Sequence, residues 1–286
     1  MSGKSIWRLI GASARGAVHA RGKKPNQDAL ALHEPNAPGE GVVLAVADGH
    51  GAPRYIRSHR GAKLAVKLAV ELLRDFGTEY PGPRRLAAVA DLANEQIPRT
   101  LVRTWQNAVR QDLAASPFTP DEEAAWAALH SERPADNDPV RAYGATLLAA
   151  LITPHYLFLL QLGDGDILVI DAAGKVGRPP LPRDPRLIAN QTTSLCSPAA
   201  WREFRTYFQP LTTRTPQLVM LATDGYANSF MDEDGFLATA VDLLAAVRAR
   251  GHRRTTNQLP RWLHATSLQG SGDDITVALA YRPTAA

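Results

Sequence analysis

The stretch VVLAVADGHG, residues 42–51, carries the strongest local signal in the sequence. Its first six residues form a short, continuous apolar run rich in valine, which predicts a buried β-strand over Val42–Ala47. Asp48 follows this strand directly. The pair Asp48-Gly49 is also typical of an ordinary turn, because aspartate accepts local backbone hydrogen bonds and glycine adopts positive φ. The stretch therefore predicts a strand that ends in either a turn or a functional carboxylate.

The same arrangement of a strand and an adjacent aspartate recurs near the C-terminus. Asp224 follows a predicted strand over residues 217–223, and Asp273 and Asp274 directly precede one over Ile275–Tyr281. In an antiparallel sheet the start of one strand lies beside the end of its neighbour, so these carboxylates can meet at one edge. Crowded carboxylates repel one another, and hard divalent cations such as Mg²⁺ or Mn²⁺ are the usual remedy. Together the aspartates predict a metal site.

The first half of the chain predicts long helices. Apolar residues recur every four positions after Pro53, a residue tolerated in the first turn of a helix, and Gly77 is placed to end that helix. A second helical pattern covers residues 84–112, and Pro98 should kink or split it. Residues 113–141 are rich in Pro, Asp and Ala around one short helical piece, and we expect a variable, flap-like segment there.

The second half predicts mainly strands, with helices near its end. Aliphatic and β-branched runs predict strands at 145–152, 156–162 and 166–171, and helical patterns predict helices near 234–248 and 258–268. Gly163-Asp164-Gly165 separates two of these strands and is interpreted as a hairpin turn. Because strands and helices come in runs and not in strict alternation, we expect an α+β fold with antiparallel sheets covered by helices.

Length and composition are those of a globular protein with a large core. The chain has 286 residues, of which 45% are hydrophobic, too many for a disordered protein. No linker or repeat divides it, so we expect one domain over residues 1–286. A single cysteine, Cys196, excludes a disulfide framework and fits a reducing compartment. The sequence has no signal-peptide pattern and no apolar run of about 20 residues, so we expect a cytoplasmic protein outside the membrane.

The net charge of +4 is small, which makes a nucleic-acid-binding protein the weaker alternative. The feature that suggests one is a basic group in the C-terminal part, made of Arg248, Arg250, His252, Arg253 and Arg254. No aromatic residues alternate with these side chains and no known binding motif accompanies them. Basic residues at a helix end are favourable because of the helix dipole, so we expect no nucleic-acid partner.

Six short motifs occur in a fixed order along the chain: Asn26-Gln27-Asp28, Val46-Ala47-Asp48-Gly49-His50-Gly51, Gly144-Ala145-Thr146, Gly163-Asp164-Gly165, Ala222-Thr223-Asp224-Gly225 and Gly272-Asp273-Asp274-Ile275-Thr276. In this order they resemble the protein phosphatase 2C family, in its bacterial-type branch. The second motif is specific by itself, and the others are informative because they occur together with it in this order. The motifs cover about residues 11–281. The resemblance implies a four-layer α-β-β-α sandwich, with two central antiparallel sheets flanked by helices.

The resemblance also implies metal-dependent hydrolysis of phosphoserine and phosphothreonine in proteins, by a metal-activated water and without a phosphoenzyme. By position, Asp48 would bridge two Mn²⁺ or Mg²⁺ ions, and the carbonyl of Gly49 would bind the second ion. Asp224 and Asp273 would complete the protein ligands of the first ion. Asp28, with Gln27, would hold water molecules bound to the ions.

Two further roles follow from the resemblance, one for a histidine and one for a basic residue. His50 matches the family's general acid, which protonates the departing Ser or Thr oxygen; a structural histidine of the turn is the alternative. Lys23 stands where the family has an arginine that binds the substrate phosphate, and Arg21 and Lys24 lie close by. A lysine binds phosphate as a point charge, without the bidentate fork of arginine.

A third metal ion, bound by many members, has two candidate ligands in this chain. Asn228 lies four residues after Asp224, where the family often has an aspartate, and its neutral amide is the weaker ligand. Asp138, which precedes Gly144, is the other candidate.

We expect phosphorylated proteins, the substrates of a Ser/Thr kinase, as partners. The alternative is a catalytically weak or inactive module of the same fold that binds phosphoproteins and regulates them. Such a module should lack at least one of the central metal ligands. Asp48, Asp224 and Asp273 are all present in this chain, which favours an active enzyme.

Overall fold

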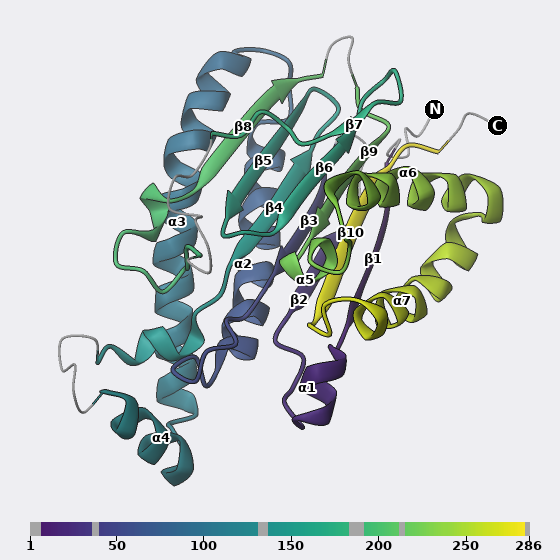
Figure 1. Ribbon diagram of the computed structural model, residues 1–286. Helices are drawn as coiled ribbons and strands as arrows, with labels where there is room; N and C mark the ends of the chain where they lie inside the picture. Colours follow the sequence, from purple (N-terminus) through teal and green to yellow (C-terminus); the bar gives the residue numbers. More distant parts are fainter. Residues whose placement is uncertain (1–6, 36–39, 131–136, 183–191, 212–214, 284–286) are drawn as a thin grey trace.

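Two five-stranded antiparallel sheets lie face to face in the computed structural model, which describes residues 7–35, 40–130, 137–182, 192–211 and 215–283 (Figure 1). In spatial order, the first sheet consists of β1 (Arg8–Ala14), β10 (Ile275–Tyr281), β9 (Leu218–Ala222), β6 (Asp166–Ile170) and β7 (Val176–Gly177). The second sheet consists of β2 (Ala29–His33), β3 (Val42–Ala47), β4 (Leu147–Ile152), β5 (Tyr156–Leu162) and β8 (Arg205–Pro210).

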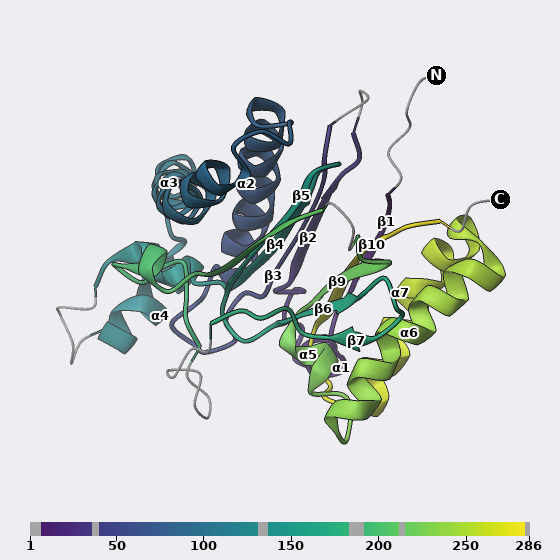
Figure 2. The same ribbon diagram turned by 90° about the horizontal axis from the view of Figure 1, so that it is seen from above.

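Two pairs of long helices cover the outer faces of the sheets (Figure 2). The second sheet is covered by α2 (Ser58–Glu79) and α3 (Leu86–Ala115), and the first by α6 (Glu233–Arg250) and α7 (His252–Gln269). The four-layer α-β-β-α sandwich is therefore confirmed. No helix within the described ranges combines the length and apolar character that crossing a bilayer requires.

The apolar run of β3 is continuous because both faces of this strand are buried. Successive side chains of a strand point to opposite faces. The side chains that pack beneath the helices are Val43, Ala45 and Ala47, and those that pack between the two sheets are Val42, Leu44 and Val46. A strand with two buried faces loses the alternation of polar and apolar residues, and its ends are held rigidly at the edge of the core.

The helices differ from the sequence prediction at three residues. Pro53 lies in an irregular segment, and α2 begins only at Ser58. Gly77 lies within α2 and does not end it; a Cβ atom there would come 3.0 Å from Leu151 of β4. Pro98 lies inside α3, which is not split. Pro98 is buried together with the apolar face of α3, and this packing outweighs the loss of one backbone hydrogen bond.

The strands differ from the prediction at one turn and at three edges. Gly163-Asp164-Gly165 is not a hairpin turn, because β5 and β6 belong to different sheets. The chain crosses between the sheets at Gly163, whose φ of +102° favours glycine. The sequence pattern also misses β1, β2 and β8. The small residues of β1 and the half-buried side chains of β8 do not form the apolar pattern that predicts a strand.

The predicted flap-like segment contains α4 (Pro120–His130), while residues 131–136 lie outside the described chain. A buried arginine, Arg57, fixes α4 to the core. Arg57 is only 2% exposed and binds Glu122 through two hydrogen bonds of 2.9 and 2.6 Å. It also donates to the Tyr143 hydroxyl and to the carbonyl oxygens of Ser116 and Pro117. The arginine thereby joins α4 to the segment that precedes the Gly144-Ala145-Thr146 motif.

We expect Arg57→Ala to lower the free energy of unfolding by about 3 kcal/mol, because it leaves the partners of a buried guanidinium unpaired. Urea denaturation followed by circular dichroism would measure this loss. Arg74→Ala is the matched control, since Arg74 pairs with Asp75 on the exposed side of α2 and should contribute little. An equally small effect of both substitutions would show that α4 is not held by Arg57.

Candidate metal centre

Four aspartates meet at one end of the sandwich because of the strand register. The pairing of β2 with β3 places Asp28 beside Asp48. The pairing of β9 with β10 places Asp224 beside the start of β10, which Asp273 precedes. The charges of the other three aspartates act on Asp48, so all four lie within electrostatic range. The predicted convergence of the strand-end carboxylates is confirmed.

A threonine hydroxyl links the two sheets at this edge. Thr223 Oγ1 donates a 2.7 Å hydrogen bond to Asp28 Oδ2, and it accepts one of 2.9 Å from the backbone N–H of Thr276. The hydrogen bond crosses from the first sheet to the second, because Thr223 follows β9 whereas Asp28 precedes β2. It therefore fixes the position of Asp28 relative to Asp224.

The loop after β3 is held by its backbone on both sides. The N–H of Asp48 donates to Thr146 Oγ1 at 3.0 Å, and the N–H of Thr146 donates to the Asp48 carbonyl at 2.8 Å. The N–H of Gly49 donates to the Gln27 carbonyl at 3.2 Å. A Cβ atom at position 49 would lie only 2.7 Å from the carbonyl carbon of Ser58. Glycine is therefore needed for this close approach, whatever its carbonyl binds.

Burial and mutual repulsion make three of the carboxyl groups hard to ionise. Burial, with added repulsion from Asp28, Asp224 and Asp273, raises the pKa of Asp48 well above its ordinary value. Burial raises the pKa of Asp28 to about 8, although the hydrogen bond from Thr223 opposes the rise. Burial and the charge of Asp164 raise the pKa of Asp224 to about 6. A group of cations would relieve this repulsion and let the carboxylates ionise.

Two buried oxygens on the residues that directly precede β2 fit this need for cations. Asp28 Oδ1 and Gln27 Oε1 have no hydrogen-bond partner in the described structure. Unpaired buried acceptors are costly and call for a ligand, a water or an ion. Hard divalent cations and their water molecules take oxygen ligands of this kind. The residues therefore fit a site for Mn²⁺ or Mg²⁺.

The raised pKa values predict how the metal-free protein responds to pH. Asp28 has an ordinary pKa of 3.8 and a folded-state pKa of about 8, so its protonated form contributes stability below about pH 4. That stability is lost as the pH rises toward 8. We expect the melting temperature of the metal-free protein to fall over this range, and to fall less in Asp28→Asn. Differential scanning calorimetry in a chelating buffer would measure how the melting temperature changes with pH in both proteins. Equal slopes would contradict the raised pKa of Asp28.

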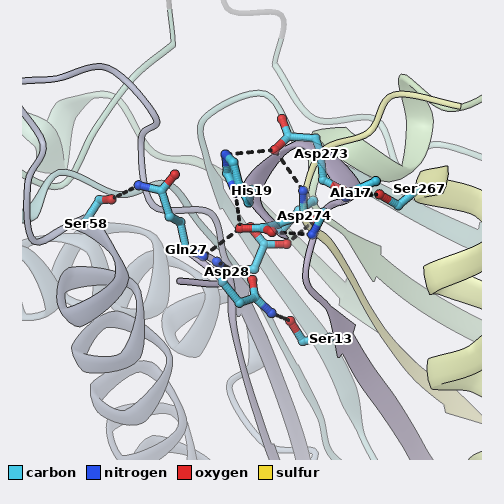
Figure 3. Close-up of polar contacts among 12 residues, drawn as sticks. Ser13, Ala17, His19, Gln27, Asp28, Ser58, Ser267, Asp273 and Asp274 are labelled. Carbon is cyan, nitrogen blue, oxygen red and sulfur yellow. Dashed lines mark hydrogen bonds and ion pairs between the residues drawn. The ribbon is translucent and has the colours of Figure 1, made fainter. Parts of the chain in front are cut away.

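The structure adds a residue that the sequence pattern does not indicate. His19 of α1 (Ala17–Arg21) lies between the two aspartates that precede β10 (Figure 3). Its Nδ1 atom is 2.8 Å from Asp274 Oδ2, and its Nε2 atom is 3.8 Å from Asp273 Oδ1. Asp274 is buried, whereas the side chain of Asp273 is half exposed. No local pattern marks His19, because its partners lie about 255 positions further along the chain.

His50 follows Asp48 by two residues in the loop after β3, and its side chain is buried. Its ring packs against Tyr55, with 4.6 Å between the centroids, and its Nε2 atom has no hydrogen-bond partner in the described structure. Burial, and then the charge of Arg54, lowers the pKa of His50 to about 4. The imidazole is therefore neutral at pH 7. A bound phosphate dianion would favour the charged imidazole and raise this pKa.

The basic residues predicted to bind phosphate are exposed. Arg21 ends α1, and Lys23 and Lys24 follow it, with Lys23 in the left-handed region at a φ of 55°. In the described residues, none of the three forms an ion pair with the aspartates of the centre. All three lie in or directly after α1, which carries His19 next to Asp274.

The two candidates for a third metal ion lie in different surroundings. Asn228 follows α5 (Asp224–Ala227), and its Nδ2 atom donates to Asp224 Oδ2 at 3.2 Å. Asp138 caps the 3-10 turn Pro139–Tyr143, where its Oδ1 atom accepts from the Val140 N–H. The cap gives Asp138 a structural role, and Asn228 is the one of the two that contacts the centre.

The remaining candidates have structural partners. Burial raises the pKa of the Cys196 thiol, which lies 3.2 Å from Ser194 Oγ and is not activated. In the basic group, Arg248 donates to Gln217, and Arg250 donates to Gln258. Arg248 and Arg250 lie in the last turn of α6, where the helix dipole favours positive charge. His252, Arg253 and Arg254 lie in the first turn of α7, where the dipole disfavours it, so the helix-end interpretation holds for two of the five residues only.

The family model for protein phosphatase 2C matches residues 15–264 of the chain. No curated protein matches the sequence significantly.

Several proteins with solved structures have a similar fold. The catalytic domain of the serine/threonine protein phosphatase PstP, in complex with two manganese ions, has a TM-score of 0.54 and 18% sequence identity, covering 97% of this chain and 99% of its own. Stp1 from Staphylococcus aureus has a TM-score of 0.57 and 12% identity, and the match covers 98% of this chain and 97% of the Stp1 chain. PppA of Pseudomonas aeruginosa, a key regulatory component of T6SS, has a TM-score of 0.56 and 19% identity. The match covers 97% of this chain and 98% of the PppA chain. At these identities the likeness establishes the fold.

Proposed function

Because the chain belongs to the protein phosphatase 2C family, we propose that it hydrolyses phosphoserine and phosphothreonine in proteins with the help of Mn²⁺ or Mg²⁺. The observation that carries this proposal is the convergence of four aspartates at one end of the sandwich, where burial and repulsion raise the pKa values of Asp28, Asp48 and Asp224. A site built in this way has no evident structural purpose without cations. Strongly perturbed carboxyl groups that gather at one site are typical of a functional centre.

Asp48, the Gly49 carbonyl, Asp224 and Asp273 would hold two cations. Bound there, the cations would supply an activated water and neutralise the phosphate oxygens. Asp28 and Gln27 each have an unpaired buried oxygen that would accept a hydrogen bond from water at the centre. Asn228 would hold Asp224 in position through its hydrogen bond. Asp138 and Asn228 remain the candidates for a third ion.

Basic residues would attract the phosphate group of the substrate, and a histidine would protonate the leaving oxygen. Lys23 and Arg21 would attract the phosphate group as exposed positive charges. His50 would donate a proton to the departing Ser or Thr oxygen, whose own basicity makes it a poor leaving group. Because a water molecule is the nucleophile, no phosphoenzyme forms. The partners would be proteins that a Ser/Thr kinase has phosphorylated. The enzyme would act on them in the cytoplasm, as part of signalling.

A panel of phosphopeptides tests this function and its alternative. We expect release of inorganic phosphate from phosphoserine and phosphothreonine peptides, and little from phosphotyrosine peptides, in the presence of Mn²⁺ or Mg²⁺. A regulatory module of the same fold would bind the peptides without releasing phosphate. Binding should therefore be measured beside turnover, by fluorescence anisotropy. Binding of phosphoserine peptides with no phosphate release in either metal would contradict the proposal.

A further inference from the structure

Both ring nitrogens of His19 face a carboxylate from the segment before β10. The Nδ1 atom is 2.8 Å from Asp274 Oδ2 and the Nε2 atom is 3.8 Å from Asp273 Oδ1, as Figure 3 shows. One ligand atom from each of these three residues lies within 4.8 Å of the others. This spacing is small enough for a single cation to be held between the histidine and an aspartate.

Asp274 is fixed in place and cannot itself turn toward a cation. Its Oδ1 atom accepts from the backbone N–H of Gly16 at 2.6 Å, and its Oδ2 atom accepts from the N–H of Gln27 at 2.6 Å. The Oδ2 atom also accepts from His19 Nδ1. A carboxylate that accepts from Nδ1 selects the tautomer in which Nε2 carries the lone pair. The ring is thus oriented with Nε2 toward Asp273.

Asp273 has the freedom that Asp274 lacks. Its side chain is half exposed, and among the described residues its Oδ1 atom accepts a local hydrogen bond, from the N–H of Asp274. Close by, Asp28 interacts electrostatically with Asp274 and leaves a buried oxygen without a partner in the described structure. The side of the centre near α1 therefore offers one nitrogen lone pair, one accessible carboxylate and one unpaired buried oxygen.

We propose that His19 Nε2 is a ligand of a divalent cation that it shares with Asp273, and that Asp274 orients the imidazole. Histidines that bind metals almost always donate their other N–H to a carboxylate or a carbonyl, which is the arrangement of His19 and Asp274. The inference rests on the proposed metal centre and deepens it. The sequence predicts a set of oxygen ligands only, and His19 adds a nitrogen.

A nitrogen ligand changes which metal the centre prefers. Imidazole binds transition metals well, whereas Mg²⁺ prefers oxygen ligands and dehydrates reluctantly. His19 therefore favours Mn²⁺ over Mg²⁺. In the competing interpretation, a protonated His19 forms ion pairs with both aspartates and contacts no metal. The two interpretations differ in whether nitrogen is bonded to the metal, which can be measured directly.

Pulsed electron paramagnetic resonance of the Mn²⁺-loaded protein tests the bond. We expect modulation from a coupled ¹⁴N nucleus in the wild type, and its replacement by a ¹⁵N signal when the protein contains ¹⁵N-histidine. The signal should disappear in His19→Asn, in which the amide N–H can still donate to Asp274. It should persist in His50→Gln, the control that removes the nearby histidine without a proposed role as a ligand.

Isothermal titration calorimetry gives the second readout. Loss of a group that merely orients a metal ligand costs about 10- to 100-fold in affinity, so His19→Asn should weaken Mn²⁺ binding by at least about that factor. Mg²⁺ binding should weaken less, so that the preference for Mn²⁺ decreases. Circular dichroism confirms that the variant is folded. If it is not, the isotope exchange in the wild type decides the question.

The possible outcomes separate this inference from the proposed function. Bound Mn²⁺ without a nitrogen signal in the wild type overturns the inference, and phosphopeptide turnover in that same sample would leave the function intact. A histidine nitrogen signal that depends on His19 supports the inference even if no peptide is hydrolysed. Equal losses of Mn²⁺ and Mg²⁺ affinity in His19→Asn contradict the predicted preference. A protein that takes up no Mn²⁺ overturns both.

Discussion

Asp48→Asn should abolish phosphopeptide hydrolysis while leaving the fold intact. Asp48 lies at the centre of the four aspartates, and its carboxylate is the proposed bridge between two cations. An amide keeps the size of the side chain but removes the charge that two cations need. Because the substitution also removes repulsion among the aspartates, the metal-free variant should melt at a higher temperature than the wild type. Turnover, metal content and melting temperature would be measured on the same preparation.

The matched control for this substitution is Asp91→Asn, because Asp91 is exposed on α3 and lies outside the centre. It should leave turnover and metal content unchanged. Asp224→Asn should resemble Asp48→Asn, since both residues are proposed ligands. Near-normal activity with normal metal content in either variant would show that the ligands are assigned wrongly.

His50→Gln should slow phosphopeptide hydrolysis by about 10²- to 10⁴-fold, the range of general acid catalysis, and slow hydrolysis of p-nitrophenyl phosphate much less. A Ser or Thr oxygen needs a proton as it departs, whereas p-nitrophenolate needs little. Steady-state kinetics on both substrates would measure the ratio of the two losses. Metal affinity should barely change, because His50 is not a proposed ligand.

His50 also has an architectural interpretation, since its ring is buried against Tyr55 and its pKa is lowered to about 4. If that interpretation holds, His50→Gln should reduce hydrolysis of both substrates equally, together with weaker metal binding or a lower melting temperature. His264→Gln serves as the control, because His264 is exposed on α7. Equal losses in His50→Gln would remove the residue from the catalytic machinery.

The sequence predicts the end of the fold that carries the aspartates well, because strand ends determine it. Each apolar run that ends in an aspartate predicts both a buried strand and a carboxylate at its edge. Antiparallel pairing places Asp28 beside Asp48 in one sheet and Asp224 near Asp273 in the other, and the stacking of the two sheets brings the two pairs together. The runs of strands and helices predict antiparallel sheets covered by helices, and the family resemblance implies their arrangement in four layers. These features depend on local patterns and on a simple rule of pairing.

Features that depend on distant contacts are not predicted. His19 lies in a short helix with no distinctive pattern, and its role comes from Asp273 and Asp274 at the other end of the chain. The crossing at Gly163 resembles a hairpin turn, because local sequence does not indicate which sheet the next strand joins. Pro98 remains helical because its surroundings are packed. In each case tertiary packing outweighs the local preference.

Metal dependence of phosphopeptide turnover tests the central claim most directly. The protein should be treated with a strong chelator, freed of it by gel filtration, and assayed with a phosphothreonine peptide while Mn²⁺ is titrated back. We predict negligible turnover without metal and recovery that follows the amount of bound Mn²⁺. Undiminished turnover in the chelated protein, with metal analysis confirming its removal, would contradict the account.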